Sequence, residues 1–148
     1  MTPATKPFVI LLAEDEPADA YLVRMALAEN RIEVELQHVT DGHEALAYLR
    51  RQAPRYDHAQ RPDLILLDLH MPHMNGRECL AELKRDAALC DIPVVVLTTS
   101  QLERDVVGSY GLGAAEYLTK PLDLDQFIAT IGRLGERWIP SACRSERP

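Results

Sequence analysis

The chain has 148 residues and a net charge of −7, and 47% of its residues are hydrophobic, which suits the core of a single domain. The acidic balance argues against a nucleic-acid-binding surface, and no apolar stretch approaches the roughly 20 residues that a membrane helix needs. Residues 1–6 lack a signal-peptide pattern and the three cysteines are widely spaced, so we expect reduced thiols in a cytoplasmic protein.

Strand and helix patterns alternate from the beginning of the chain. An apolar run predicts a buried strand at Phe8–Ala13, and Pro17 then opens a helix that reaches about Asn30. A β-rich stretch predicts an edge-side strand at Val34–Val39, after which Asp41 caps a second helix. The segment Gln52–Pro62 is polar, contains two prolines and has no periodicity, so it is predicted to be a loop.

The same alternation continues through the middle of the chain. Residues 64–67 are uniformly apolar and predict a strand that is buried on both faces, followed by a helix at 76–85. A fourth strand is predicted at 93–98 and a short helix at 101–109. These elements repeat the order strand, helix, strand, helix.

The last strand is predicted at 115–118, and a helix with apolar residues at helical spacing at 122–138. Residues 141–148 are polar and are expected to be frayed. We therefore expect one domain at 7–138 and a tail at 139–148 that is too short for an output domain. Five strands alternating with five helices imply an α/β sandwich with a parallel sheet and right-handed crossovers.

Three carboxylates follow two of the predicted strands. Asp68 comes directly after strand 64–67, and Glu14 and Asp15 come directly after strand 8–13. Open parallel sheets bind ligands at the carboxyl ends of their strands, where these acids would converge. Three ionised carboxylates would repel one another, so the cluster needs either a raised pKa or a hard cation such as Mg²⁺. The alternative is that each acid merely ends a strand in solvent.

Two further polar residues lie at strand ends. Thr98 ends the fourth strand and Lys120 follows the fifth. A hydroxyl and an ammonium group beside a metal-bound carboxylate are suited to hold phosphoryl oxygens. A carboxylate can itself accept a phosphoryl group as a nucleophile, so a phosphorylated aspartate is chemically reasonable.

Four segments together resemble the receiver domain of two-component response regulators, in the right order. They are Leu11–Asp15 (LLAED), Leu66–Pro72 (LLDLHMP), Val96–Ser100 (VLTTS) and Tyr117–Pro121 (YLTKP). The resemblance extends from about Pro7 to Trp138. It implies a flavodoxin-like (CheY-like), doubly wound sheet of five parallel strands in the order 2-1-3-4-5.

By this resemblance, Asp68 is the phosphoacceptor and takes its phosphoryl group from a phosphohistidine of a sensor histidine kinase. The resemblance also implies a Mg²⁺ site, which Mn²⁺ could fill. Asp15 and Asp68 would bind the metal directly, Glu14 mostly through water, and His70 through its backbone carbonyl. The chain would be a phosphoacceptor signalling protein rather than an enzyme.

The resemblance assigns the remaining polar residues to the phosphoryl group and the switch. Thr98 and Lys120 would contact phosphoryl oxygens, and Tyr117 would be the aromatic switch residue. The bond between Lys120 and Pro121 lies where the family often has a cis peptide. The His70 side chain would either tune the phosphoryl lifetime or be a tolerated residue at the rim. The other histidines (His38, His43, His58 and His73) show no metal-ligand spacing and are expected at the surface.

The loop 52–62 and the segments 41–51 and 92–100 are similar to stand-alone regulators paired with bacterial phytochromes. This similarity implies a light-sensing kinase as partner and a homodimer through the last helix and the C-terminal extension. Trp138 and Ile139 extend the apolar stripe of that helix towards the terminus. Either they serve a dimer, or Trp138 folds back onto its own domain.

Two rival functions use the same fold. A Mg²⁺-dependent phosphohydrolase would act on small phosphate esters from the same sheet edge, but it needs a dedicated acid and a lid. A flavodoxin-type electron carrier would need a phosphate-binding loop after the first strand, where Glu14, Asp15 and Glu16 would repel a phosphate. We therefore favour a phosphorylation-switched interaction module.

Overall fold

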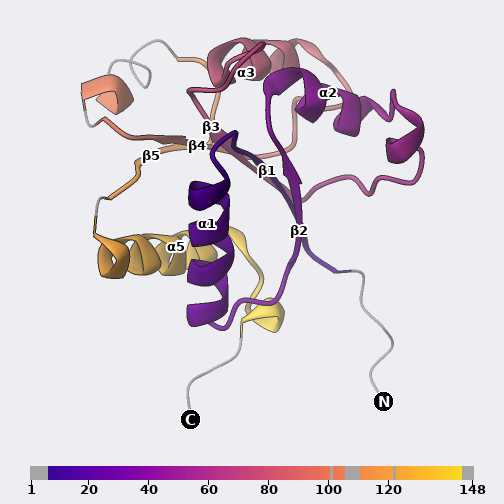
Figure 1. Cartoon of the computed structure of the whole chain (residues 1–148). Helices are drawn as coiled ribbons and strands as arrows, with labels where there is room; N and C mark the ends of the chain where they lie inside the picture. Colours follow the sequence, from indigo (N-terminus) through magenta and orange to yellow (C-terminus); the bar gives the residue numbers. More distant parts are fainter. Residues whose placement is uncertain (1–6, 101, 106–110, 122, 145–148) are drawn as a thin grey trace, which may run out of the picture.

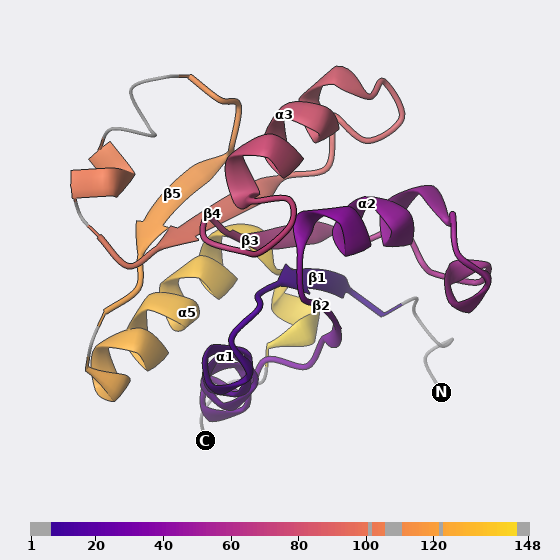
Figure 2. The ribbon, with the colours of Figure 1, turned by 45° about the horizontal axis from the view of Figure 1, so that its top comes forward.

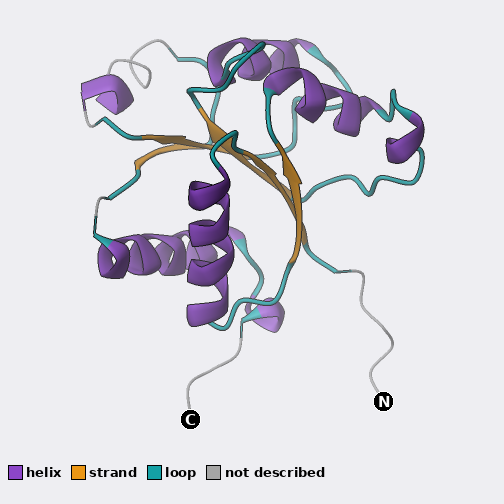
Figure 3. Cartoon of the chain, in the orientation of Figure 1, coloured by secondary structure: helices purple, strands orange, loops and turns teal. Residues whose placement is uncertain are grey.

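A parallel sheet of five strands forms the centre of the molecule. The computed structural model describes residues 7–100, 102–105, 111–121 and 123–144. The strand order is β2-β1-β3-β4-β5, as predicted. The strands are β1 (Val9–Ala13), β2 (Glu35–Val39), β3 (Leu64–Asp68), β4 (Val94–Thr98) and β5 (Glu116–Thr119). Figure 3 shows them as a twisted layer between two layers of helices.

Two helices cover each face of the sheet. The helices are α1 (Pro17–Glu29), α2 (Gly42–Arg50), α3 (Gly76–Arg85) and α5 (Leu124–Trp138). α1 packs with α5 on one face and α2 with α3 on the other, as Figures 1 and 2 both show. Residues 102–105 are also helical, between β4 and β5. The predicted CheY-like fold is confirmed.

The strand sequences explain why the sheet has two cores. β1, β3 and β4 are buried along their whole length, which requires apolar residues on both faces. In β1, Leu11 and Ala13 belong to the core beneath α2 and α3. Ile10 and Leu12 belong to the core beneath α1 and α5. Each central strand therefore contributes alternate side chains to both helix layers.

Side-chain caps fix where the helices begin. The Asp41 carboxylate accepts a hydrogen bond from the Glu44 amide at 2.7 Å, and Asn75 and Glu78 form a reciprocal capping box at the start of α3. Asp123 caps α5 by accepting from the Asp125 amide at 2.7 Å. α5 consequently begins at Leu124 instead of residue 122, which lies outside the described residues.

The loop predicted at 52–62 contains a short 3₁₀ helix, η1 (Pro54–Tyr56). Tyr56 explains this order, because its ring packs edge-on against Tyr48 at 5.3 Å and its hydroxyl donates to Glu44 at 3.2 Å. Of the helix predicted at 101–109, residues 102–105 are helical. Residues 101 and 106–109 lie outside the described part of the chain.

The prediction of a frayed tail is wrong for residues 141–144. Ile139 is buried, and a 3₁₀ turn follows it at Ser141–Cys143 (η2). The Glu33 amide donates to the Cys143 carbonyl at 2.7 Å, which ties this segment to the connection between α1 and β2. Backbone hydrogen bonds of this kind do not depend on side-chain polarity, so composition did not reveal them.

The three cysteines lie in different environments, and none forms a disulfide. Cys79 is fully buried in α3, and burial raises the pKa of its thiol to about 12. Cys90 and Cys143 are only partly buried. No helix in the described part of the chain has the length and apolarity to cross a bilayer.

We predict that two thiols of the native protein react with Ellman's reagent at mildly alkaline pH and that Cys79 does not. The thiolate is the form that reacts with the reagent. A thiol with a pKa of about 12 stays protonated in a mildly alkaline buffer. Absorbance should report two thiols in native buffer and three in denaturant. The Cys79→Ala variant should leave the native count unchanged. Three fast-reacting thiols in the native protein would contradict this assignment.

Candidate functional site

Strand register gathers the predicted site residues at one edge of the sheet. Ala13 lies beside Leu67 in the pairing of β1 with β3, so Glu14 and Asp68 follow next to each other. Thr98 lies beside Thr119 in the pairing of β4 with β5, so Lys120 follows next to Thr98. Four parallel strands thus end at the same place, as the sequence predicted.

Three carboxylates converge at this edge. Oxygen atoms of Glu14, Asp15 and Asp68 all lie within 4.8 Å of one another. Glu14 and Asp68 are 1% and 5% exposed, whereas Asp15 is exposed. An all-oxygen set of this kind, open on one side, suits a hard divalent cation that keeps several waters. The predicted divalent-cation site fits these residues.

The Lys120 ammonium contacts three carboxylates, of which two belong to this cluster. Its Nζ lies 2.5 Å from Glu14 Oε1, 3.2 Å from Asp19 Oδ2 and 3.5 Å from Asp68 Oδ1. The Lys120 side chain is only 11% exposed. The second Glu14 oxygen accepts from the Glu16 amide at 3.3 Å. The ammonium therefore neutralises part of a buried negative cluster that would otherwise be costly.

Burial and charge shift two pKa values in this cluster. Burial raises the pKa of Glu14 to about 7, opposed by the hydrogen bond and charge of Lys120 and aided by the nearby Asp68. Burial alone would lower the pKa of Lys120, but the hydrogen bond to Glu14 and the charge of Asp68 outweigh it, so the pKa is raised. Lys120 therefore remains an ammonium at neutral pH, as contact with phosphoryl oxygens requires.

Thr98 is fully buried at the end of β4. Its hydroxyl accepts a hydrogen bond from the Ser100 amide at 3.3 Å, and its carbonyl accepts from the Lys120 amide at 2.6 Å. The second bond joins the ends of β4 and β5 beside Asp68. The structure contains no cis peptide bond among its described residues, so the expectation for Lys120 and Pro121 is not met.

His70 lies at the rim of the acid cluster. Its side chain is 64% exposed, and Nε2 lies 2.7 Å from Glu103 Oε1. Both residues line an open depression of about 630 Å³ that also includes Asp15. The sequence analysis did not single out Glu103 or Asp19. Asp19 could have been predicted from the sequence, because the helix that follows Glu14 and Asp15 carries it in its first turn.

Tyr117 lies farther back on β5. Its hydroxyl accepts from the Ala114 amide at 3.3 Å, and its ring packs against the core under α2 and α3. Within the described residues, no hydrogen bond joins Tyr117 to Thr98 or Lys120. Its role as a switch residue therefore stays a prediction.

Gly76 allows α3 to begin directly against the end of β3. A Cβ atom at this position would lie 2.4 Å from the Asp68 carbonyl oxygen and 2.8 Å from Leu69 Cα. The Gly76 amide donates to the Leu69 carbonyl at 3.0 Å. The loop between β3 and α3 is thereby folded tightly beside the phosphoacceptor candidate, a constraint that the sequence analysis did not identify.

His38 is also part of the site, although it was expected at the surface. It is partly buried on β2, and its Nε2 lies 2.7 Å from the Glu14 carbonyl oxygen. A carbonyl oxygen can only accept, so Nε2 carries the proton. The Glu14 amide donates to the Val39 carbonyl at 2.9 Å. Two bonds from β2 therefore position the turn that carries Glu14 and Asp15.

We predict that His38→Leu weakens binding of Mn²⁺, used here as a probe, by roughly fivefold. Loss of one hydrogen bond costs about 1 kcal/mol and would loosen the turn that carries Asp15. His38→Gln should retain most of the affinity, because its amide can donate in place of Nε2. Electron paramagnetic resonance of free Mn²⁺ measures the affinity.

The matched control for this experiment is His43→Leu, which removes an exposed imidazole from α2. It should bind Mn²⁺ like the wild type. Equal affinities for His38→Leu and His43→Leu would show that His38 does not position the acids.

Comparison with known proteins identifies the family. Residues 10–132 match the response regulator receiver domain. Response regulator Rcp1 of Synechocystis sp. is 45% identical over 133 residues, which cover 90% of each chain. The solved structure of the phosphorylated cyanobacterial phytochrome response regulator RcpA is 45% identical with a TM-score of 0.82 and covers 95% of this chain and 100% of that one. The Mn²⁺-bound form of Rcp1 is 43% identical, with a TM-score of 0.80 and the same coverage.

The bacteriophytochrome response regulator RtBRR is also similar, at 43% identity and a TM-score of 0.76, over 88% of this chain and 79% of that one. The predicted kinship with phytochrome response regulators is therefore confirmed as a relationship of sequence and fold. The match spans nearly all of the described sheet and helices. The chain belongs to the response regulator receiver domain family.

Proposed function

We propose that Asp68 accepts a phosphoryl group from a phosphohistidine of a sensor histidine kinase. The observation that supports this proposal most directly is the position of the Asp68 carboxylate. It lies 3.5 Å from Lys120 Nζ and within 4.8 Å of oxygens from two other acids. A carboxylate in this setting has a cation on one side and a cation-binding acid pair on the other.

The proposed transfer is a nucleophilic displacement at phosphorus. An Asp68 oxygen forms a bond to phosphorus while the phosphorus–nitrogen bond to the kinase imidazole breaks. The electron pair of that bond leaves with the imidazole nitrogen, and the product is an acyl phosphate. Lys120 and the Thr98 hydroxyl would each contact a phosphoryl oxygen and so stabilise the charge that the group carries.

The acid cluster would hold Mg²⁺ or Mn²⁺ during this reaction. Asp15 and Asp68 would bind the ion directly, Glu14 mostly through water, and His70 through its carbonyl oxygen. When bound, the metal would neutralise phosphoryl oxygens. The mixed burial of these acids supports this arrangement, since only Asp15 is exposed for exchange with solvent.

Phosphorylation would then change the surface that partners meet. The Thr98 hydroxyl accepts from the Ser100 amide, and its own hydrogen would be donated to a phosphoryl oxygen. Tyr117 would follow as the aromatic switch residue. We infer that the signal leaves by protein–protein contact or by onward phosphotransfer from residues 7–138, which form the receiver domain, with 139–148 as its tail.

The kinase partner would approach beside Lys120. A groove of about 140 Å³ there is lined by apolar residues of α1 and α5, including Leu22, Val23 and Phe127. Tyr21 and Leu124 are 64% and 45% exposed. Such a surface suits an apolar helix face of a partner. RcpA and RtBRR are named as phytochrome response regulators, which supports a phytochrome-type kinase as the partner.

We predict that acetyl phosphate phosphorylates the wild-type protein at Asp68 in the presence of Mg²⁺. Removing the metal with EDTA should reduce labelling to background, because the acid cluster would repel an anionic donor. Asp68→Asn should abolish labelling, whereas Asp57→Asn should label normally, since Asp57 is exposed on a distant loop. Intact and peptide mass spectrometry measures and locates the added group.

Two results would contradict the proposed function. One is phosphorylation on a residue other than Asp68. The other is rapid turnover of unrelated phosphate esters, which would instead support a Mg²⁺-dependent phosphohydrolase at the same sheet edge.

We also propose that two copies pair through α5 and the C-terminal extension. Much of the apolar stripe of α5 is used internally, because Ile131 and Leu134 are fully buried and Trp138 Nε1 donates to Glu116 at 2.9 Å. What supports pairing is the apolar area that remains, at exposed Leu124 and half-buried Ile128.

We predict a concentration-dependent dimer that Leu124→Ala weakens, because truncation removes apolar surface from the interface. Sedimentation velocity measures the monomer–dimer equilibrium. Leu102→Ala is the matched control, since Leu102 is 74% exposed and lies outside α5. A monomer at all concentrations, or equal effects of both variants, would contradict pairing through α5.

A further inference from the structure

A second pocket lies at the opposite end of the sheet from Asp68. It is about 340 Å³ in volume and lies between the end of α2, residues 59–62 and residues 88–89. Pro62 lines it and directly precedes β3, whereas Asp68 ends β3. The pocket is therefore separate from the acid cluster, and its size is typical of small-molecule sites.

Hydrogen bonds hold the walls of this pocket in place. The Tyr48 hydroxyl donates to the Gln60 carbonyl at 2.9 Å, and Arg51 Nε donates to the Ala59 carbonyl at 2.9 Å. Arg61 Nη1 donates to the Ala88 carbonyl at 2.7 Å. These three bonds hold residues 59–61 against α2 and against the connection between α3 and β4. The walls of the pocket are therefore fixed relative to one another.

Three arginines line the pocket, and they are not equivalent. Arg50 lies 3.3 Å from Asp86, and Arg61 lies 2.6 Å from Asp91. Arg51 has no carboxylate within salt-bridge distance among the described residues, and its two Nη atoms make no hydrogen bond there. Its Nε bond to Ala59 orients the guanidinium while leaving the Nη donors available.

Arg51 has a left-handed backbone conformation, which Arg31 and His73 also adopt. Its φ and ψ of 53° and 45° place it in the left-handed region at the end of α2. Glycine or asparagine is the usual residue in this position, since other side chains are less stable there. An arginine at this position is therefore held at a conformational cost.

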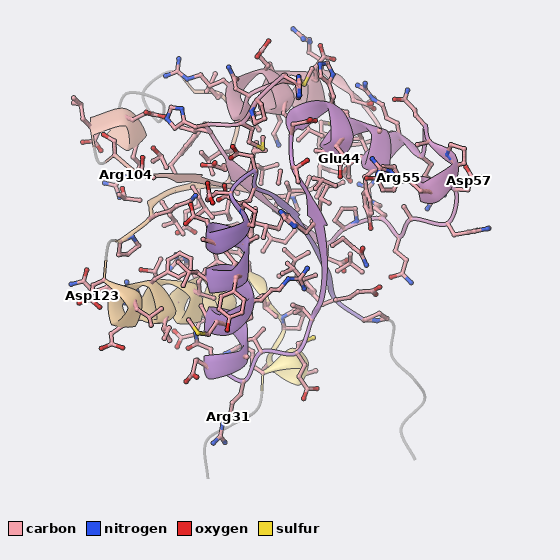
Figure 4. All side chains as sticks on the ribbon, viewed as in Figure 1. Arg31, Glu44, Arg55, Asp57, Arg104 and Asp123 are labelled. Carbon is pink, nitrogen blue, oxygen red and sulfur yellow. The ribbon has the colours of Figure 1, made fainter. Side chains whose placement is uncertain are left out.

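The charge of this region is opposite to that of the whole chain. Residues 48–62 contain four arginines and one aspartate, whereas the chain has a net charge of −7. Figure 4 labels one of these arginines, Arg55, close to Glu44, and Arg55 lies 3.7 Å from that carboxylate. Arg55 is not among the residues that line the pocket.

We propose that this pocket binds a small phosphate-bearing ligand through Arg51 and Arg61. A guanidinium presents parallel donors that match phosphate oxygens. Arg61 is already paired with Asp91, so a ligand must compete with that carboxylate. A phosphate group can do so because it carries more negative charge than a single carboxylate. The buried Tyr48 and Leu89 side chains supply an apolar wall for the rest of the ligand.

Pyrophosphate in EDTA-containing buffer is the probe that tests this site. The full chain, labelled with ¹⁵N, should show amide shift changes confined to residues 48–51, 59–61 and 88–89. Isothermal titration should show affinity about tenfold lower in Arg51→Gln, the expected loss for one charge-assisted contact. Arg61→Gln should also bind more weakly, and lactate, a monocarboxylate, should bind worse than pyrophosphate.

Arg55→Gln is the matched control, because it removes the same charge from the same loop outside the pocket. It should bind pyrophosphate like the wild type. An equal loss in Arg55→Gln would overturn the proposal in favour of general charge attraction. Shift changes centred on Asp15, Asp68 and Lys120, or no changes at millimolar pyrophosphate, would also overturn it. The amide spectrum of each variant reports whether it is folded.

Discussion

The buried contact between Lys120 and the Glu14–Asp68 pair is the constraint on which the site depends. Two carboxylates at 1% and 5% exposure would be costly without a cation. Lys120 supplies one charge for both, and burial still raises the pKa of Glu14 to about 7. The cluster is therefore incompletely neutralised, and a second cation beside Asp15 would complete the compensation. The same electrostatic imbalance that makes the site expensive to fold also makes it receptive to a metal ion.

The sheet order is what makes this contact available. Lys120 follows β5 and Glu14 follows β1, two strands that are separated in the sheet by β3 and β4. The long Lys120 side chain crosses the ends of those two strands, and its Nζ lies 2.5 Å from Glu14 Oε1. The Lys120 backbone is also tied to the Thr98 carbonyl. Its ammonium can thus move from Glu14 towards a group on Asp68 while the sheet remains unchanged. The Thr98 hydroxyl accepts from the Ser100 amide, and its own hydrogen remains available for the same group.

Sequence patterns were sufficient for the fold and for most of the cluster, and their limits have physical causes. Buried parallel strands are uniformly apolar, so polar residues at their ends were conspicuous and Asp68, Thr98 and Lys120 could be predicted. His38 could not, because its contribution is one hydrogen bond to a backbone carbonyl 24 residues away. Gly76 was also missed, since only the close approach of α3 to the Asp68 carbonyl explains it. The bond that ties residues 141–144 to the connection between α1 and β2 joins the Glu33 amide to the Cys143 carbonyl, and no side-chain pattern encodes such a bond.

α2 connects the two ends of the molecule that have opposite charge. Its first residue, Gly42, donates to the Met74 carbonyl at 2.9 Å, in the loop that leads from Asp68 to α3. Its last turn leads into Arg51, at the arginine-lined pocket. Glycine is required at this contact, because a Cβ at position 42 would lie 2.7 Å from Met74 Cγ. A ligand in the pocket would affect Asp68 through α2 only to the extent that it binds two positions of this helix with different affinity. Without that difference, the pocket and the phosphoacceptor site would act independently on one scaffold.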